Sequence, residues 1–313
     1  MTLTRRILLS AAAGLGATLA IRPSFAGVSM SGRITPKLTL QHADGRTTDY
    51  RVMTPATGGR WGVVLFSHGA NSSNDSYDRV WQAWADRGYM VIGPNHIDTG
   101  PPAAQRKVGF PALFRSRIAD IKAPLAQKAP FDALAKAQGA SLDLAAICGA
   151  GHSYGSVVAQ ALAGATILVP GEGTPANARE ASVVACVCLS PPGPLKDFIP
   201  ADAWSTVTIP VLVQTGDQDM LPHFVDDWRS RLTGLAGAPN RWTIVARGVN
   251  HYFHGLICTL TDGPYPDLPA LTETGRLSGE FIDAYVRHDA RALQALTLRA
   301  GQGDDGVLTF AAA

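Results

Sequence analysis

Three polar residues, spread over almost a hundred positions, have the types and the order of a nucleophilic catalytic site. Ser153 stands at the centre of the motif GHSYG, Asp219 ends the stretch TGDQD after the predicted strand 209–214, and His251 ends the stretch GVNH after the predicted strand 241–247. A serine hydroxyl is a weak nucleophile at neutral pH, so it needs a base to take its proton and an acid to orient that base. The sequence therefore predicts that Ser153 attacks, His251 takes the proton and Asp219 orients His251.

The Gly-x-Ser-x-Gly motif becomes specific through its surroundings. The apolar run LAAIC (144–148) predicts a strand before it, and SVVAQALAGA (156–165) predicts a helix after it. Strand, sharp turn and helix are the setting of a nucleophile elbow, in which the serine adopts a strained backbone conformation. Gly151 and Gly155 remove side chains that would collide at this crossing. The alternative is a strand-to-helix loop that only needs small residues.

The two loops that supply the acid and the base each hold a second candidate. Asp217 precedes Asp219, and we interpret it as a turn former that hydrogen-bonds its own backbone. His254 follows His251, and we prefer His251 as the base because it comes soonest after the predicted strand. His254 is then a candidate for the wall of the substrate pocket.

Charge that develops on an attacked carbonyl needs hydrogen-bond donors. The N–H of Tyr154 is one predicted donor, because it follows the nucleophile at the start of a helix. The second usually comes from a loop after an earlier strand, and here the apolar run GVVLF ends at Ser-His-Gly just before Ala70. We assign the Ala70 N–H, with Asn71 as the alternative. Asn71 and His96 are further candidates for the substrate pocket, although His96 equally fits a role in bonding local backbone groups.

The elements that must position these residues indicate an α/β fold. Buried strands are predicted for six apolar runs: residues 62–66, 89–94, 144–148, 182–190, 209–216 and 241–247. Helices are predicted at 76–87, 156–165 and 274–288, with helical patterning also at 115–136 and a loop at 95–114. Strands that alternate with helices predict a mostly parallel sheet covered on both faces. The runs 37–43 and 49–55 around Asp44 and Gly45 predict an antiparallel N-terminal hairpin. About 20 residues separate the strands 182–190 and 209–216, which is too few for a large lid.

The N-terminus has the features of an export signal. A basic pair, Arg5 and Arg6, precedes a mildly apolar run that ends in a small-residue cleavage site after Ala26. The pair in its context is typical of the twin-arginine route. We therefore expect residues 1–26 to be a signal and residues 27–313 to be a single exported domain, periplasmic or secreted, without stable membrane insertion after cleavage. The alternative is an uncleaved anchor.

Composition excludes several other classes of protein. The chain has 313 residues, of which 46% are hydrophobic and 17% charged, as in ordinary globular proteins. Removal of residues 1–26 takes away three arginines and no acid, so the formal charge falls from +2 to −1. The mature charge gives no reason to expect a nucleic-acid partner. The expected partner is a small-molecule or polymeric ester.

No metal site and no cofactor are expected. The spacing of the cysteines matches no zinc site: Cys148, Cys186, Cys188 and Cys258. An oxidising compartment permits a disulfide among them, and the sequence leaves this open.

These motifs together resemble the α/β-hydrolase superfamily, and within it dienelactone-hydrolase-like esterases, platelet-activating-factor acetylhydrolases and cutinase-like polyester hydrolases. The resemblance is carried by VVLFSHGANSS, ADRGYMVIGPNH, the helix that holds Arg117 and Asp120, CGAGHSYGS, IPVLVQTGDQD and GVNHYFHG. In such families the acid ends a Gly-x-x-Asp pattern, which supports Asp219. Dienelactone hydrolases proper use a cysteine nucleophile. Because this chain has Ser153, the resemblance implies an ester hydrolase.

The expected activity is cleavage of carboxylic esters through an acyl-enzyme, with short-chain or extended substrates favoured by an open cleft. A peptidase, thioesterase or acyltransferase is the alternative on the same three residues, because fold does not fix the acceptor. A non-catalytic binding protein on this fold is the second alternative, and the presence of all three residues argues against it.

Overall fold

The computed structural model describes residues 32–100, 108–221, 224–233, 238, 240–255, 257 and 269–312. The predicted export signal, residues 1–26, lies outside this part of the chain, and so does Cys258. Within the described ranges, no helix is long and apolar enough to cross a membrane.

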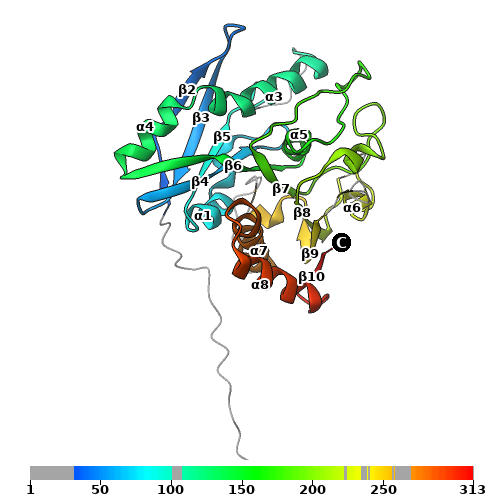
Figure 1. Ribbon diagram of the computed structural model, residues 1–313. Helices are drawn as coiled ribbons and strands as arrows, with labels where there is room; N and C mark the ends of the chain where they lie inside the picture. Colours follow the sequence, from blue (N-terminus) through cyan, green and yellow to red (C-terminus); the bar gives the residue numbers. More distant parts are fainter. Residues whose placement is uncertain are drawn as a thin grey trace, which may run out of the picture.

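A mixed sheet forms the centre of the molecule (Figure 1). Its strands are β1 (Arg33–Ile34), β2 (Leu38–Gln41), β3 (Thr47–Thr54), β4 (Gly59–Ser67), β5 (Tyr89–Pro94), β6 (Ala140–His152), β7 (Val183–Leu189), β8 (Val211–Gln218), β9 (Arg241–Asn250) and β10 (Leu308–Ala312). They lie in the order β1-β3-β5-β4-β6-β7-β8-β9-β10, with β2 paired to β3. The six strands from β5 to β9 run parallel, and the pairs at both ends are antiparallel. The predicted mostly parallel sheet and its N-terminal hairpin are confirmed.

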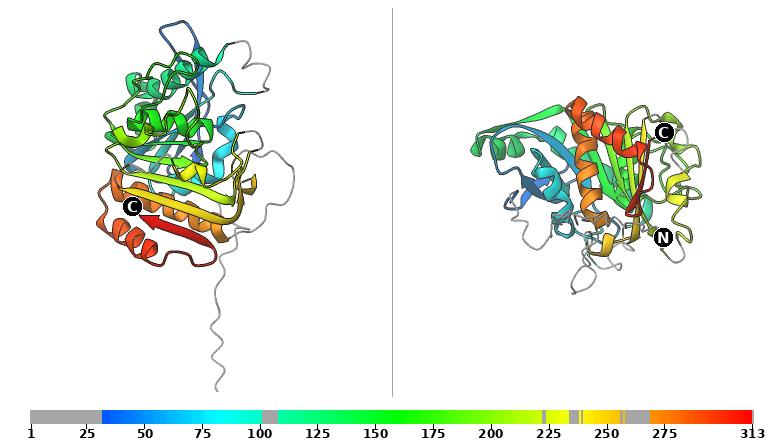
Figure 2. Two further views of the ribbon diagram at one scale, coloured as in Figure 1. Left: turned by 90° about the vertical axis from the view of Figure 1, so that its right-hand side faces the viewer. Right: turned by 90° about the horizontal axis from the view of Figure 1, so that it is seen from below.

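Helices cover both faces of the sheet. One face carries α3 (Phe110–Ala126), α4 (Ala129–Ala137) and α5 (Tyr154–Ala163), and the other carries α1 (Asp78–Ala85), α7 (Pro269–Val286) and α8 (Ala290–Gly301). Short turns of helix are η1 (Asn74–Tyr77), η2 (Ala203–Thr206), α6 (Ser230–Thr233) and η3 (Phe253–Gly255). Figure 2 shows α7 and α8 stacked below the sheet. Each face therefore has its own apolar core, and the central strands β4, β5 and β7 are buried between the two. Apolar burial on both faces explains why these strands lack a polar alternation.

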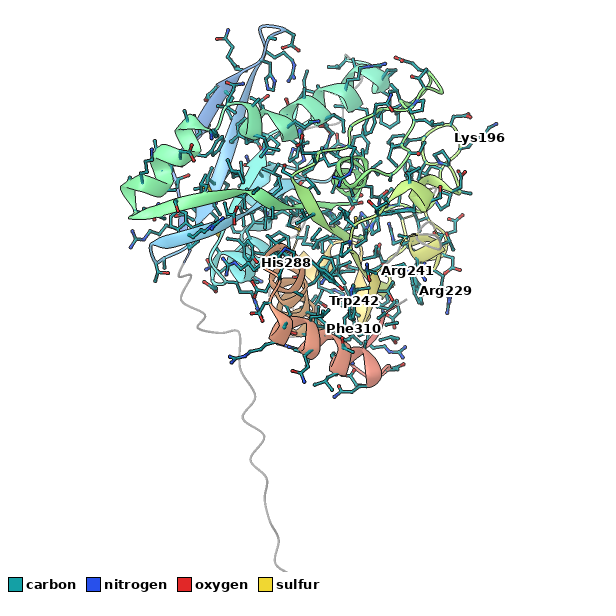
Figure 3. The ribbon with its side chains drawn as sticks, viewed as in Figure 1. Lys196, Arg229, Arg241, Trp242, His288 and Phe310 are labelled. Carbon is teal, nitrogen blue, oxygen red and sulfur yellow. The ribbon has the colours of Figure 1, made fainter. Side chains whose placement is uncertain are left out.

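The sequence analysis did not predict the helix and the strand that follow α7. After α7, the structure adds α8 and the edge strand β10, which pairs antiparallel with β9. The rings of Trp242 on β9 and Phe310 on β10 stack with centroids 5.4 Å apart, and Figure 3 labels both side chains. The predicted loop at 95–114 is also corrected, because α3 already begins at Phe110. A proline stands in the first turn there, where its missing N–H costs nothing.

The turn from β6 into α5 crosses very close to the end of β4. A Cβ atom on Gly155 would lie 2.0 Å from the carbonyl oxygen of Ser67, and one on Gly151 would lie 2.3 Å from the carbonyl oxygen of Gly155. Only hydrogen fits at either position without a backbone shift. These two glycines are therefore a steric requirement of the crossing.

Gly155→Ala is expected to destabilise the fold by about 3 kcal/mol or more, because the new methyl group overlaps backbone atoms that cannot rotate away. The control is Gly301→Ala at the end of α8, where an added Cβ meets no atom within 4 Å. That variant should stay within about 1 kcal/mol of the wild type. Urea unfolding of both variants measures the difference. Equal stability of the two variants would contradict the close crossing.

Candidate functional site

The three residues singled out by the sequence meet at the carboxyl ends of the parallel strands. The hydroxyl oxygen of Ser153 lies 3.0 Å from Nε2 of His251. Nδ1 of the same ring lies 2.8 Å from Oδ1 of Asp219. Ser153 follows β6, Asp219 follows β8 and His251 follows β9. The order of the strands thus brings together residues separated by up to 98 positions.

Ser153 has the backbone conformation of a nucleophile elbow. Its φ is 53° and its ψ is −120°, a region that residues other than glycine rarely adopt. Its N–H donates to the carbonyl of Leu189 at 2.9 Å, which fixes the turn to the end of β7. The next residue, Tyr154, begins α5, so its N–H lies at the positive end of the helix dipole.

The carboxylate of Asp219 is fully buried and receives several donors. Thr215 donates its hydroxyl to Oδ2 at 2.7 Å, while His251 and Arg231 share Oδ1. Nη2 of Arg231 lies 2.7 Å from Oδ1, and its side chain is 1% exposed. The sequence did not point to Arg231, because it lies on the four-residue helix α6 and belongs to no motif.

Burial governs the ionisation of this group of residues. It lowers the pKa of His251, an effect that the Asp219 carboxylate opposes and the Arg231 guanidinium reinforces. For Asp219, burial alone would raise the pKa, but the hydrogen bond and charge of His251 together with Arg231 hold it below its ordinary value. The site therefore combines an ionised carboxylate with an imidazole that favours its neutral form.

A second buried arginine fixes the loop that follows β4. Arg117, on α3, donates to the carbonyls of His68 at 2.6 Å and Gly69 at 3.1 Å, and pairs with the carboxylate of Asp98 at 2.6 Å. The Gly69 carbonyl also accepts from Nδ1 of His68 at 2.7 Å. In a trans peptide the C=O and the following N–H point in opposite directions. The N–H of Ala70 is therefore turned away from Arg117.

His96 does not have the position expected of a pocket residue. Its side chain is fully buried, with Nδ1 3.0 Å from the carboxylate of Asp120 and Nε2 2.9 Å from the hydroxyl of Ser67. Its backbone N–H donates to Nε2 of His68. Both ring nitrogens are thus engaged inside the protein. Neither role weighed for His96 is observed: its ring bonds the side chains of Asp120 and Ser67, which are distant in sequence, and not a substrate cleft or local backbone groups.

A short polar chain joins the loop after β4 to the loop after β9. The N–H of Gly69 donates to the hydroxyl oxygen of Tyr77 at 2.9 Å, and this hydroxyl lies 3.1 Å from Nδ1 of His152. Nε2 of His152 donates to the carbonyl of His251 at 3.0 Å. Burial lowers the pKa of His152 to about 3, so the ring is neutral. His152, the second residue of GHSYG, therefore couples the two loops, a role that its place in the motif did not reveal.

The remaining predicted residues lie close by in different roles. Asp217 accepts from the N–H of Gly248 at 2.7 Å, so it braces the base loop instead of its own turn. His254 lies 2.5 Å from the Gly248 carbonyl through Nε2. Asn71 is exposed and has a φ of 58°, which turns the chain after Ala70.

Aromatic rings gather beside Ser153. The ring of Tyr154 stacks on Phe110 at 5.7 Å and lies 6.0 Å from Phe198, and Phe114 joins the same group. Phe110 is 49% exposed, so the group reaches the surface. Phe114 is buried, whereas Phe110 lies at the exposed edge of the group.

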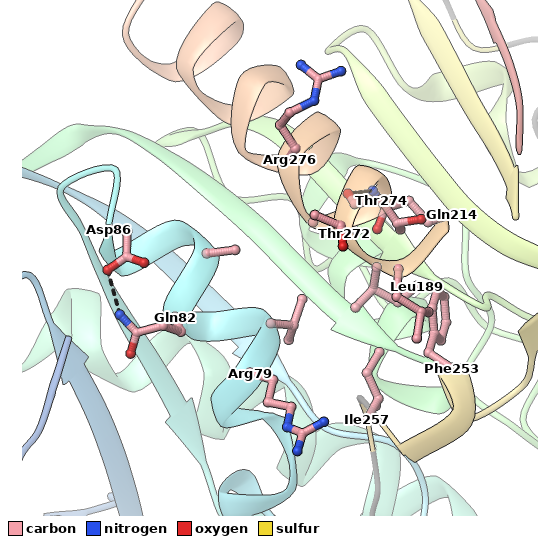
Figure 4. A pocket seen from close by; sticks show the side chains of 14 residues that line it. Arg79, Gln82, Asp86, Leu189, Gln214, Phe253, Ile257, Thr272, Thr274 and Arg276 are labelled. Carbon is pink, nitrogen blue, oxygen red and sulfur yellow. Dashed lines mark hydrogen bonds between the residues drawn. The ribbon is translucent and has the colours of Figure 1, made fainter. Parts of the chain in front are cut away.

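A cavity of about 250 Å³ lies between α1 and α7, on the face of the sheet opposite to α5 (Figure 4). It borders the site through Leu189 and Phe253, and Gln82 and Asp86 lie hydrogen-bonded at its far rim. In the ranges that the structure describes, no three His, Cys, Asp or Glu side chains form a group that could hold a metal ion.

Asp98→Asn is expected to reduce the free energy of unfolding by about 3–5 kcal/mol, because it leaves the buried guanidinium of Arg117 without its counter-charge. The control is Glu172→Gln, which breaks an exposed ion pair between Glu172 and Arg115; Arg115 lies on α3, the helix that also holds Arg117. That change should cost less than about 1 kcal/mol. Guanidinium-chloride unfolding measures both, and a cost for Asp98→Asn as small as that of the control would contradict the role given to the buried pair.

Comparison with known proteins supports the fold. A model of the family described as chlorophyllase matches residues 27–168, a stretch that holds Ala70, Arg117 and Ser153. Two proteins named chlorophyllase-1, chloroplastic, from Citrus unshiu and Citrus sinensis, are each 29% identical over 87 residues, which is 28% of this chain and 26% of each relative. The matched stretch thus spans about a quarter of the length of these relatives. The sheet order and the strand-elbow-helix give the chain an α/β-hydrolase fold, and its residues 27–168 are similar to the chlorophyllase family.

Proposed function

We propose that this protein hydrolyses carboxylic esters, with Ser153 as nucleophile, His251 as general base and Asp219 as the acid that orients it. The observation that carries the proposal is the unbroken chain of contacts from the Ser153 hydroxyl to His251 at 3.0 Å and from His251 to Asp219 at 2.8 Å. The similarity of residues 27–168 to chlorophyllases supports a hydrolase that acts on esters.

The reaction proceeds in two halves. The Ser153 oxygen attacks the ester carbonyl while Nε2 of His251 takes the hydroxyl proton. His251 then gives this proton to the leaving alkoxide, so an alcohol departs and an acyl-serine remains. In the second half, His251 takes a proton from water, the resulting hydroxide attacks the acyl group, and the proton returns to Ser153. Asp219 keeps the Nδ1–H of His251 in place throughout.

The negative oxygen of each tetrahedral intermediate is held by the N–H groups of Tyr154 and Ala70. The first lies at the start of α5. The second is directed away from Arg117 because Arg117 and His68 hold the Gly69 carbonyl. Asn71, next in the loop, serves as the alternative donor. Donors fixed before the reaction stabilise the intermediate without reorganisation.

The proposed substrates are esters of short-chain acids or extended, polymeric esters, because the short connection between the predicted strands 182–190 and 209–216 predicts an open cleft. The partly exposed ring of Phe110 beside Tyr154 supports binding of an apolar or aromatic group. The names of the Citrus relatives refer to chlorophyll, which makes a bulky apolar ester a further class to test. Export from the cytoplasm is part of the same proposal and rests on the sequence of residues 1–26.

Ser153→Ala is expected to lower the rate of hydrolysis of p-nitrophenyl esters by about a thousandfold or more, because it removes the attacking oxygen. The control is Ser141→Ala, since Ser141 is exposed on β6 and far along the strand from the elbow. A series from acetate to palmitate gives the preferred acyl length. Activity of Ser153→Ala equal to that of Ser141→Ala would exclude Ser153 as the nucleophile, whereas silence of the wild type would exclude these esters as substrates.

The pH profile of kcat/KM should rise with pH and level off, with a midpoint below about 6.5, the ordinary pKa of histidine. The sign follows from the site: the neutral form of His251 is the active base, and burial lowers its pKa. Lower pKa means that neutral His251 persists to lower pH. Rates from pH 4 to 9 with p-nitrophenyl acetate measure the midpoint, and a value of 7 or above would contradict the prediction.

A further inference from the structure

Arg231 binds backbone carbonyls of two loops and also contacts the side chains of Asp219 and His251. Its Nε donates to the carbonyl of Asp219 at 3.0 Å, and its Nη1 donates to the carbonyls of Ser190 at 3.0 Å and Pro191 at 3.1 Å. These three bonds tie the end of β7 to the acid loop. Its Nη2 reaches the Asp219 carboxylate at 2.7 Å and lies 3.0 Å from Nδ1 of His251.

The two neighbours of Oδ1 are both donors. When Nε2 of His251 accepts from Ser153, the proton of the ring is on Nδ1 and points at Asp219 Oδ1. Nη2 of Arg231 then also donates to Oδ1, and the two nitrogens lie side by side. The carboxylate is thus shared between a permanent cation and the ring that becomes a cation during the reaction.

We propose that Arg231 is a positioning residue that clamps Asp219 against His251 and balances the charge of Asp219, so that the neutral, base-competent form of His251 persists into acidic solution. This inference rests on the proposed function. An imidazolium formed beside a carboxylate that already has a guanidinium partner gains less from that carboxylate. The arrangement therefore trades some base strength for activity at lower pH.

The other groups that face His251 do not supply this effect. From β6, His152 lies with its ring centroid 4.9 Å away, but it is neutral because burial lowers its pKa to about 3. From the base loop, Tyr252 contacts the ring edge to face at 5.1 Å and brings no charge. From the loop after β8, Asp219 raises the pKa of His251, and from α6, Arg231 lowers it. Among the described groups around this ring, Arg231 is therefore the cation that opposes the effect of Asp219 on the pKa of His251.

Two variants separate charge from geometry. Arg231→Gln removes the charge but keeps an amide nitrogen at the level of Nε, which can still donate to the carbonyl of Asp219. The midpoint of the acid limb of its kcat/KM profile should move upward by about one pH unit, because a nearby positive charge is lost. At low pH, this shift lowers kcat/KM about tenfold relative to the wild type, when each is normalised to its own plateau. Arg231→Lys keeps the charge but loses the planar fork. Its limb should stay within 0.3 units of the wild type while kcat falls and KM changes little.

The control is Arg229→Gln, two residues earlier, whose side chain is 69% exposed and pairs with Asp227 at the surface (Figure 3). Its kcat/KM profile should have the same acid-limb midpoint and the same plateau value as that of the wild type. Circular dichroism at each pH confirms that the compared proteins are folded. If Arg231→Gln does not fold, Arg231→Lys decides alone: an upward move of its limb by more than half a unit overturns the proposal.

A fluorophosphonate that phosphonylates serine hydrolases, with fluoride as the leaving group, gives the same pH limb without an ester substrate. If the wild type is not inactivated at all, the proposed function fails. If the wild type is inactivated and the limb of Arg231→Gln coincides with that of the wild type, the function stands and the role of Arg231 is wrong. An upward shift in both the inactivation and the hydrolysis profiles supports the role.

Discussion

The close approach of the β6–α5 turn to the end of β4 is the constraint on which the site depends. Because Gly155 has no side chain, the turn can pass directly beside the Ser67 carbonyl and the loop that holds Ala70. A methyl group at Gly155 would overlap that carbonyl. The same turn forces Ser153 to a positive φ and exposes the Tyr154 N–H at the helix start. A strained residue persists only where the surroundings determine it, and here two glycines and the bond to Leu189 do so.

Buried arginines organise the loops that regular structure leaves without partners. Loops at the end of a sheet have carbonyls that need donors, and a guanidinium supplies five in a fixed plane. Arg117 joins His68 and Gly69 to Asp98, and Arg231 joins Ser190 and Pro191 to Asp219. Each cation has one buried carboxylate, so its charge is compensated. The two arginines thus hold the oxyanion side and the acid side of the site in similar ways.

The sequence predicted the parallel strands and the positions of Ser153, Asp219 and His251, because buried strands are continuously apolar and polar residues just after them must gather at one edge. It could not predict β10, a five-residue edge strand in which the alternation that buries Leu308 and Phe310 covers only three residues. It also missed His152, Tyr77 and Arg231, whose roles arise from contacts between distant segments. Arg117 carried a signal, since it stands three residues before Asp120 on the buried face of α3, but no local pattern shows which carbonyls it binds.

The most direct measurement of the central claim is the covalent intermediate itself. Rapid mixing of the protein with a slowly deacylated p-nitrophenyl ester should release one equivalent of p-nitrophenol per active site in a burst. Acid quenching followed by peptide mass mapping should then find the acyl group on the peptide that contains Ser153. A burst with the acyl group on any other residue, or turnover without any acylated peptide, would contradict the account.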